Sequence, residues 1–255
     1  MDTVPPIGLG TMGIDDPATI ATAIELGYRH LDTAQIYGNE DVVGEGIARS
    51  DVDREELFVA TKVWADRLGV EDVRPSVEES LNELGIEHVD LLYVHRPIET
   101  YEPTQTLPAF DALVDDGLID HVGLSNFSPA ELDEAREILD RPVFAHQVEL
   151  HPLFQSPGLV TYAQVHDHVL VAYSPLIAGR ADEIPALREI AEDHDITPTQ
   201  ASLAWVLSKE SVVAIPKASS QEHLEANLDV TGVKLSAKEI QRIDNLERQE
   251  ELFPE

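Results

Sequence analysis

Three segments with the composition of buried strands end at Asp32, Lys62 and His95, and Tyr37 follows the first of them by five positions. If these strands are parallel neighbours, their carboxyl ends meet at one rim, which is where parallel barrels place their active sites. A carboxylate, a phenol, an ammonium and an imidazole would then lie within reach of one another.

These four groups have complementary chemistry. A phenol, with an ordinary pKa of about 10, is a poor acid at neutral pH, but a nearby ammonium stabilises the phenolate. Lys62 is suited to that role, and Asp32 would keep it charged. His95 would donate a hydrogen bond to a carbonyl oxygen or relay a proton. The set would therefore protonate the alkoxide formed when a hydride reaches a carbonyl, with the hydride supplied by a reduced cofactor.

Each residue alone has a more ordinary interpretation. A strand-end aspartate commonly caps a helix, a tyrosine packs at a rim, a lysine is a solvated charge, and a histidine makes a structural polar contact. The combination on successive strands is what favours catalysis.

Short apolar runs alternate with longer amphipathic segments along the whole chain, which is typical of βα units. The expected strands are 7–11, 30–32, 57–62, 89–95, 121–125, 143–149, 169–173 and 212–215. The expected helices are 17–25, 40–48, 73–84, 106–115, one capped by Ser128, 159–166, 184–193, 199–209, 221–228 and one capped by Ser236. Eight units in this order predict an α/β fold, a (β/α)8 TIM barrel, in a single domain over residues 1–255.

The composition narrows the class of protein. Cysteine is absent, so disulfides, thiolate catalysis and cysteine zinc sites are excluded. His166 and His168 are two positions apart and would diverge on a helix, so we expect a solvated turn there and no metal site. No segment has membrane-spanning length, and the amino terminus does not resemble a signal peptide. A cytoplasmic enzyme is expected.

The formal net charge is −32, from 17 basic and 49 acidic residues. Such a charge would repel nucleic acid and anionic membranes, so neither is an expected partner. The acids are spread over the helices, and hydrophobic residues still make up 43% of the chain. We therefore expect a globular, halophilic protein with an acidic surface, screened by high salt; the alternative is an ordinary acidic mesophilic protein.

Several motifs resemble, in order along nearly the whole chain, those of the aldo-keto reductase family. They are Gly8-Leu9-Gly10-Thr11, Leu31-Asp32-Thr33-Ala34 with Tyr37-Gly38-Asn39-Glu40, Thr61-Lys62-Val63-Trp64, Asp90 to Pro97, Gly123 to Phe127, Gln147 to Pro152, Ala172 to Leu176, and Ile215-Pro216-Lys217. The resemblance implies a barrel that binds NADP(H) in extended form. It also implies a catalytic tetrad of Asp32, Tyr37, Lys62 and His95, with Tyr37 as general acid reducing a small aldehyde or ketone. Family members are often monomers, and we expect a monomer here.

The resemblance also assigns cofactor contacts. Ser125, Asn126 and Gln147 correspond to the residues that hold the nicotinamide amide, and Tyr173 to the ring that stacks on the nicotinamide. The complete set of expected cofactor residues is Gly10, Thr11, Asp32, Ser125, Asn126, Gln147, Tyr173, Ser174, Pro175, Leu176, Gly179, Ile215, Pro216, Lys217, Ala218, Ser219, His223 and Asn227.

The adenosine end departs from the family pattern. The family commonly has Lys-Ser after Ile-Pro, an arginine five positions later, and then Glu-Asn. Here Ala218 follows Lys217, His223 replaces the arginine, and Ala226 precedes Asn227. We expect NADP(H) because Lys217 is present, with NAD(H) use possible because the charged fork for a 2′-phosphate is reduced.

Substrate contacts are expected from Tyr37, His95, Trp64 and Phe127; Trp64 alone would equally suit core packing. The segments 98–106 and after Leu246 are short, which predicts an open site and broad substrates. Two alternatives stay open. Lys62 would form a Schiff base in a lyase or aldolase, or the chain would be a cofactor-sensing binding subunit with little turnover.

Overall fold

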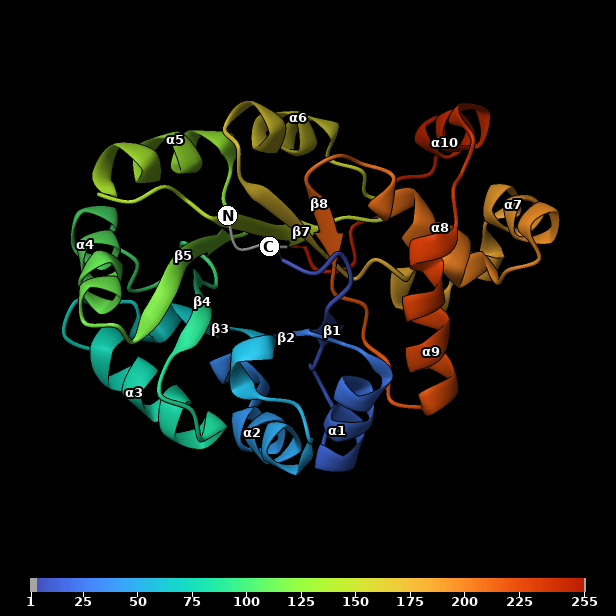
Figure 1. The fold of residues 1–255 in the computed structure, drawn as a ribbon. Coiled ribbons are helices and arrows are strands. Elements are labelled where there is room, and N and C mark those ends of the chain that lie inside the picture. Colours follow the sequence, from blue (N-terminus) through green and yellow to red (C-terminus); the bar gives the residue numbers. More distant parts are fainter. Residues whose placement is uncertain (1–3, 255) are drawn as a thin grey trace.

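The computed structural model describes residues 4–254 and shows a ring of parallel strands surrounded by helices (Figure 1). The strands are β1 (Leu9–Gly10), β2 (His30–Asp32), β3 (Phe58–Val63), β4 (Val89–Val94), β5 (Ile119–Ser125), β6 (Ala145–Glu149), β7 (Val169–Tyr173) and β8 (Val212–Ala214). Each strand pairs in parallel with the next along the chain, in the order β1 to β8. The predicted (β/α)8 barrel is confirmed.

The first and last strands close the ring. Ile7, just before β1, forms a parallel bridge with Ala214 at the end of β8. The amide of Gly8 donates to the Ala214 carbonyl over 2.8 Å, and the amide of Ala214 donates to the Pro6 carbonyl over 3.0 Å. A side chain at Gly10 would place its Cβ 2.7 Å from the Ile215 carbonyl oxygen, so only glycine allows this close approach.

Half of the α-helices in residues 4–254 begin after a residue whose side chain caps the helix. The helices are α1 (Pro17–Leu26), α2 (Glu40–Arg49), α3 (Val73–Leu84), α4 (Pro103–Asp115), α5 (Pro129–Ile138), α6 (Pro157–Val165), α7 (Pro185–His194), α8 (Pro198–Leu207), α9 (Gln221–Asp229) and α10 (Ala237–Asp244). Ser128, Thr197 and Ser236 form complete capping boxes. Within residues 4–254, no helix combines the length and the apolar character needed to cross a bilayer.

Several element boundaries differ from the sequence prediction by one to three residues, and two of these differences have a clear physical reason. Helix α4 begins at Pro103 instead of residue 106, because proline suits the first helical turn and the Glu102 carbonyl accepts from Thr106 at 2.7 Å. Strand β1 is only Leu9–Gly10, because the flanking residues pair with β8 through isolated hydrogen bonds.

Two apolar layers hold the ring in shape. The larger core lies between strands and helices, and a smaller one fills the barrel. The inner cluster consists of Phe58, Ala60, Leu91, Tyr93, Ala145, Val171, Val213 and Ile215. Side chains alternate along a strand between these two layers. The strand ends above the inner cluster are therefore the places where polar side chains can converge.

Candidate active site

Asp32 and Lys62 form a buried ion pair at the carboxyl ends of β2 and β3. The Lys62 side chain has no exposed surface, and that of Asp32 is 1% exposed. The Lys62 ammonium donates to Asp32 Oδ1, to the Thr33 carbonyl over 2.8 Å and to the Tyr37 hydroxyl over 3.4 Å. These three acceptors match the three donors of an ammonium group.

The ion pair sets the charge of Lys62. Burial alone would lower the pKa of the amine, but the carboxylate of Asp32, with Tyr37, raises that pKa above its ordinary value. Lys62 is therefore an ammonium at neutral pH. Because the phenol oxygen of Tyr37 accepts the lysine's hydrogen bond, the phenol's own O–H is directed to another acceptor.

His95 follows β4 and faces Tyr37 and Trp64. Its ring centroid lies 6.0 Å from that of Tyr37 and 4.9 Å from that of Trp64, both edge to face. Burial, and then the charges of Lys62 and Arg96, lower the pKa of His95 to about 2. The imidazole is therefore neutral at physiological pH, and a neutral imidazole has one N–H to donate.

The residues after Tyr37 anchor the turn that carries it. Tyr37 lies on a one-turn 3-10 helix, η1 (Gln35–Tyr37). Behind it, the buried Asn39 amide donates to the carbonyls of Thr11 and Ile14 over 2.8 and 2.9 Å. The hydroxyl of Thr61, next to Lys62, donates to the buried Glu40 carboxylate. Asn39 and Glu40 therefore position Tyr37 and Lys62 without lining the cavity.

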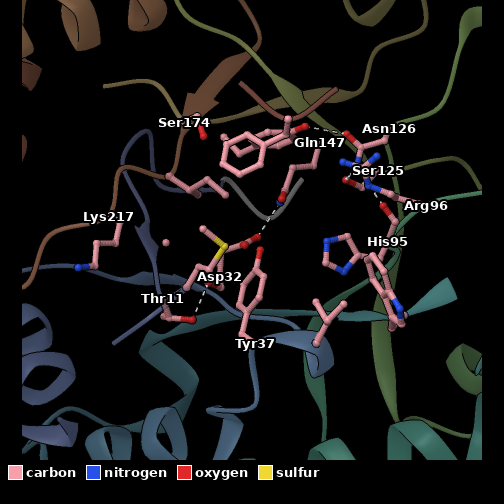
Figure 2. Close-up of a pocket in the computed structure, with 17 residues that line it drawn as sticks. Thr11, Asp32, Tyr37, His95, Arg96, Ser125, Asn126, Gln147, Ser174 and Lys217 are labelled. Atoms are coloured by element: carbon pink, nitrogen blue, oxygen red, sulfur yellow. Dashed lines mark hydrogen bonds between the residues drawn. The ribbon is translucent and has the colours of Figure 1, made fainter. Parts of the chain in front are cut away.

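A cavity of about 270 Å³, called here the catalytic cavity, opens above this cluster (Figure 2). Its lining residues are Gly10, Thr11, Met12, Asp32, Ile36, Tyr37, Trp64, His95, Arg96, Ser125, Asn126, Gln147, Tyr173, Ser174, Ile215, Lys217 and Phe253. Figure 2 shows Tyr37 and His95 at this cavity, with Lys217 on one side and Arg96 on the other.

Polar groups from β5, β6 and β7 form another wall of this cavity. The Gln147 amide donates to Asp32 Oδ2 over 2.7 Å. The Asn126 amide donates to the His95 carbonyl over 3.0 Å, and its oxygen accepts from the Tyr173 hydroxyl over 3.0 Å. Asn126 and Ser174 have φ values of 61° and 53°, a left-handed conformation that costs energy in residues other than glycine and is concentrated at functional sites.

A second cavity of about 760 Å³, the lateral cavity, adjoins the first. The two share Met12, Ser174, Lys217 and Phe253, so they form one extended cleft. The other residues of the lateral cavity are Gly13, Pro175, Leu176, Ala178, Gly179, Thr197, Thr199, Gln200, Glu222, His223, Ala226 and Asn227. In contrast to the catalytic cluster, Lys217, Glu222 and His223 are exposed.

Most expected site residues therefore line one of these two cavities. Lys62 lies beneath the surface of the first. Pro216 and Ala218 are buried, and the exposed Ser219 accepts from the Lys217 ammonium over 3.4 Å. Phe127 is buried against Tyr101, with ring centroids 5.5 Å apart, and lines a third cavity instead of the catalytic one.

Four residues of the catalytic cavity are not among those expected from the sequence: Met12, Ile36, Arg96 and Phe253. Ile36 directly precedes Tyr37, and Arg96 directly follows His95. Their position next to an expected catalytic residue is therefore the signal that would identify them. Met12 similarly follows Thr11. No local pattern marks Phe253, because its place depends on contacts distant in the sequence.

Phe253 is held at the cleft by Glu149, at the end of β6. The buried Glu149 carboxylate accepts from the amides of Leu252 and Phe253 over 2.6 and 3.0 Å, and it lies 2.8 Å from His151 Nε2. The Phe253 ring packs edge to face on Tyr173, with centroids 5.9 Å apart. The carboxyl-terminal residues thus form part of the cleft wall.

The predicted solvated turn is wrong for one of its residues, His168. His166 and Asp167 form an exposed turn, but His168 is buried, and its Nδ1 lies 2.6 Å from an Arg136 nitrogen. His168 directly precedes β7, and its side chain lies beside Arg136 of α5. Among the described residues, no three histidine, cysteine, aspartate or glutamate side chains are placed to hold a metal ion.

A closed (β/α)8 barrel with an ionisable cluster opening into a cavity at its carboxyl rim has the architecture of barrel enzymes. The model of the Aldo/keto reductase family matches residues 6–248. The chain therefore belongs to the aldo-keto reductase family, and it is an oxidoreductase.

Individual proteins are similar over nearly the full length. The chain is 37% identical to 9,11-endoperoxide prostaglandin H2 reductase of Trypanosoma cruzi, covering 95% of this chain and 88% of that one. It is 36% identical to methylglyoxal reductase DkgB of Escherichia coli O157:H7, covering 99% and 98%. The solved structure of MGS-M4, an aldo-keto reductase from a Medee basin deep-sea metagenome library, is 33% identical, with a TM-score of 0.94 and coverage of 99% and 95%.

Proposed function

We propose that this protein reduces the carbonyl group of small aldehydes or ketones to an alcohol, with NADPH as the preferred cofactor. The observation that carries the proposal is the hydrogen bond from the buried, charged Lys62 to the Tyr37 hydroxyl, at the floor of a cavity. The Tyr37 phenol, next to this ammonium, is suited to donate a proton to the alkoxide that forms when a carbonyl group is reduced.

The chain's residues divide the work as follows. Tyr37 donates its proton to the carbonyl oxygen, and the Lys62 ammonium stabilises the phenolate that remains. Asp32 keeps Lys62 charged. Neutral His95 donates its N–H to the same carbonyl oxygen and orients the substrate, with Trp64 forming the adjacent wall.

The donor set of the cleft fits an extended nicotinamide dinucleotide. Asn126, Gln147 and Ser125 offer groups for the carboxamide, and the Tyr173 ring offers a stacking surface. Lys217 offers a cation for a phosphate, in a cavity that continues from the catalytic one. When bound, the reduced nicotinamide supplies the hydride.

The Schiff-base alternative requires an uncharged Lys62, which the Asp32 carboxylate opposes by raising the pKa of the amine. A cofactor-sensing subunit without turnover would have no need for a buried ion pair beneath a phenol. Both considerations favour the reductase.

The direct test is a fluorescence titration with NADPH and NADH at high salt, followed by cofactor oxidation with a panel of aldehydes and ketones. We expect saturable binding of NADPH, tighter than NADH, and turnover with several carbonyls. Tight binding with no oxidation across the panel would instead indicate a sensor. Borohydride trapping of a carbonyl substrate on Lys62 would indicate a lyase.

A further inference from the structure

The last described residues, 248–254, lie at the cleft and are called here the strap. Its residue Phe253 lines the catalytic cavity, the lateral cavity and the third cavity, and no other described residue lines all three. The Phe253 ring packs on Tyr173, the ring that would stack on the nicotinamide. The strap therefore passes the place where the three cavities meet.

Glu149, at the end of β6, holds the strap in this position. Its carboxylate accepts from the amides of Leu252 and Phe253 over 2.6 and 3.0 Å. The Leu153 amide donates to His151 Nδ1 over 3.2 Å, so the other ring nitrogen carries the proton and donates to Glu149 over 2.8 Å. Three N–H groups therefore satisfy the carboxylate, and two of them belong to the strap.

The burial of Glu149 makes these contacts strong. The residue is 3% exposed, and a buried carboxylate is stable only when donors surround it. Hydrogen bonds to a charged group are about twice as strong as those between neutral groups. Opening of the strap is therefore opposed chiefly by the loss of its two hydrogen bonds to Glu149.

The strap is not part of the buried core. None of its residues is buried, and Phe253 is 39% exposed. The Glu250 amide donates to the Leu153 carbonyl over 2.8 Å, and the Glu250 carboxylate pairs with Arg180 over 2.7 Å. A segment with few buried apolar contacts opens at a small cost, without unfolding the rest of the protein. The strap can therefore open while the barrel stays folded.

The strap lies on the path of the proposed cofactor. The catalytic and lateral cavities meet at Met12, Ser174, Lys217 and Phe253. A dinucleotide with its nicotinamide against Tyr173 and a phosphate beside Lys217 would span both cavities and pass this junction. Entry and exit of such a ligand would therefore depend on whether the strap is closed or open.

We propose that Glu149 is a positioning residue that holds the strap over the cofactor cleft, so that opening of the strap sets how fast the nicotinamide cofactor binds and leaves. This inference depends on the proposed function, because the gated ligand is the proposed cofactor. A gate that opens more often speeds entry and exit equally and leaves the affinity unchanged. Loss of a binding contact would instead speed exit alone and weaken the affinity.

The first test is Glu149→Gln, which keeps the shape of the side chain but replaces one acceptor oxygen with an NH2 group. Hydrogen exchange of the Leu252 and Phe253 amides, measured by NMR without cofactor, is expected to become about tenfold faster or more, because a charge-assisted hydrogen bond is lost. Stopped-flow fluorescence, with Trp64 in the cavity wall as reporter, gives the NADPH rates. Association and dissociation are both expected to become about tenfold faster, with the Kd within about threefold.

Glu247→Gln is the matched control. Glu247 is an exposed carboxylate directly before the strap and lines none of the three cavities. This variant removes the same negative charge near the strap without touching the Glu149 contacts. Both NADPH rates and the exchange of the two amides are expected to stay within about twofold of the wild type.

A second pair of variants leaves the buried carboxylate in place. Leu252→Pro removes the N–H that donates to Glu149, whereas Leu252→Ala keeps it. Leu252→Pro is expected to speed both NADPH rates as Glu149→Gln does, and Leu252→Ala to change them less than about threefold. The free energy of unfolding of Leu252→Pro, measured with urea, is expected to stay near the wild-type value, because the strap opens separately from the barrel.

Salt distinguishes the buried contacts from those at the surface. Glu250→Gln breaks the partly exposed pair with Arg180. It is expected to speed both NADPH rates about threefold at about 0.1 M salt and to have no effect at about 2 M, where the pair is screened. The effect of Glu149→Gln is expected at both salt concentrations, because its contacts are buried.

Three results would overturn the role of Glu149 while the reductase function stands. Unchanged amide exchange in Glu149→Gln would show that this carboxylate does not hold the strap. Unchanged NADPH rates in Glu149→Gln and Leu252→Pro, despite faster amide exchange, would show that the strap is not a gate. Faster dissociation alone, with a matching rise in the Kd, would make the strap a binding contact. A wild-type protein that binds neither NADPH nor NADH would overturn both proposals.

Discussion

The two ends of the extended cleft differ in the burial of their charged side chains. At the catalytic end, Lys62 and Asp32 are almost fully buried, and their charges are fixed by each other. At the lateral end, Lys217, Glu222 and His223 are exposed. The proposed chemistry requires fixed protonation states, whereas the proposed cofactor selection would depend on weaker contacts with solvent-exposed charges. Substitutions should therefore have large effects at the first end and graded effects at the second.

The largest expected effect is at Tyr37. Replacing Tyr37 with Phe removes the proposed acid and leaves its ring, so kcat is expected to fall about 10³-fold or more, within the range for general acid catalysis. The Kd for NADPH, measured by fluorescence, is expected to change less than about twofold. Near-normal turnover by this variant would exclude Tyr37 as the acid.

Asp32→Asn tests the buried charges directly. It leaves the Lys62 ammonium without its carboxylate, which is expected to lower the free energy of unfolding by about 3 to 5 kcal/mol. Urea denaturation measures the loss. The double variant Asp32→Asn/Lys62→Met removes both charges and is expected to recover most of the stability. An Asp32→Asn protein as stable as the wild type would show that the ion pair is not the stabilising contact.

Acid is expected to weaken the barrel beneath the catalytic end. Burial is the largest cause that lowers the pKa of His30 to about 4 and that of His95 to about 2, from an ordinary value of 6.5. As the pH falls below about 6.5, the unfolded chain takes up protons first, so the free energy of unfolding falls.

The replacement His30→Phe isolates one of these histidines. Between pH about 7.5 and about 5, the variant is expected to lose about 2 kcal/mol less stability than the wild type, measured by urea unfolding. His88→Gln, at an exposed histidine beside Asp120, is the control for the loss of one histidine. Equal slopes for all three proteins would contradict a neutral, buried His30.

At the lateral end, Lys217→Ala is expected to raise the KM for NADPH about tenfold, because a charge-assisted contact with a phosphate is lost. The KM for NADH and the kcat with either cofactor are expected to stay within about twofold. An equal change for both cofactors would place Lys217 at a phosphate that the two share.

The smallest effect is expected at Glu222, an exposed carboxylate in the same cavity. Glu222→Gln removes a negative charge that opposes a phosphate, so the KM for NADPH is expected to fall about threefold, with NADH unchanged. Glu225→Gln, one turn of α9 away on an exposed residue outside the lateral cavity, is the matched control. A rise in the KM for NADPH would show that Glu222 assists binding.

The barrel and its central cluster could be predicted because both follow from local patterns. Alternating apolar and amphipathic segments indicate βα units, and parallel strands bring their carboxyl ends together. Asp32 and Lys62 lie at such ends, and the structure places them in contact. The family resemblance added the expected cofactor residues, most of which line the two cavities.

The features that could not be predicted depend on long-range packing. Glu149 and Phe253 are more than a hundred positions apart. Nothing in the sequence near either residue indicates that the Glu149 carboxylate accepts a hydrogen bond from the Phe253 amide. His168 is buried because β7 passes beneath α6, although the adjacent His166 and Asp167 are exposed. Phe127 has an aromatic side chain near the rim, but its packing against Tyr101 turns it away from the catalytic cavity.

The bridge between Ile7 and Ala214 has a consequence for how the protein is made. During synthesis the edge of β1 that faces β8 has no partner until nearly the whole chain has left the ribosome. Long-range pairing of this kind slows folding and exposes a sheet edge to aggregation. Folding yield in the cell should therefore depend on chaperones that shield nascent chains, and variants that weaken β8 should accumulate as insoluble protein.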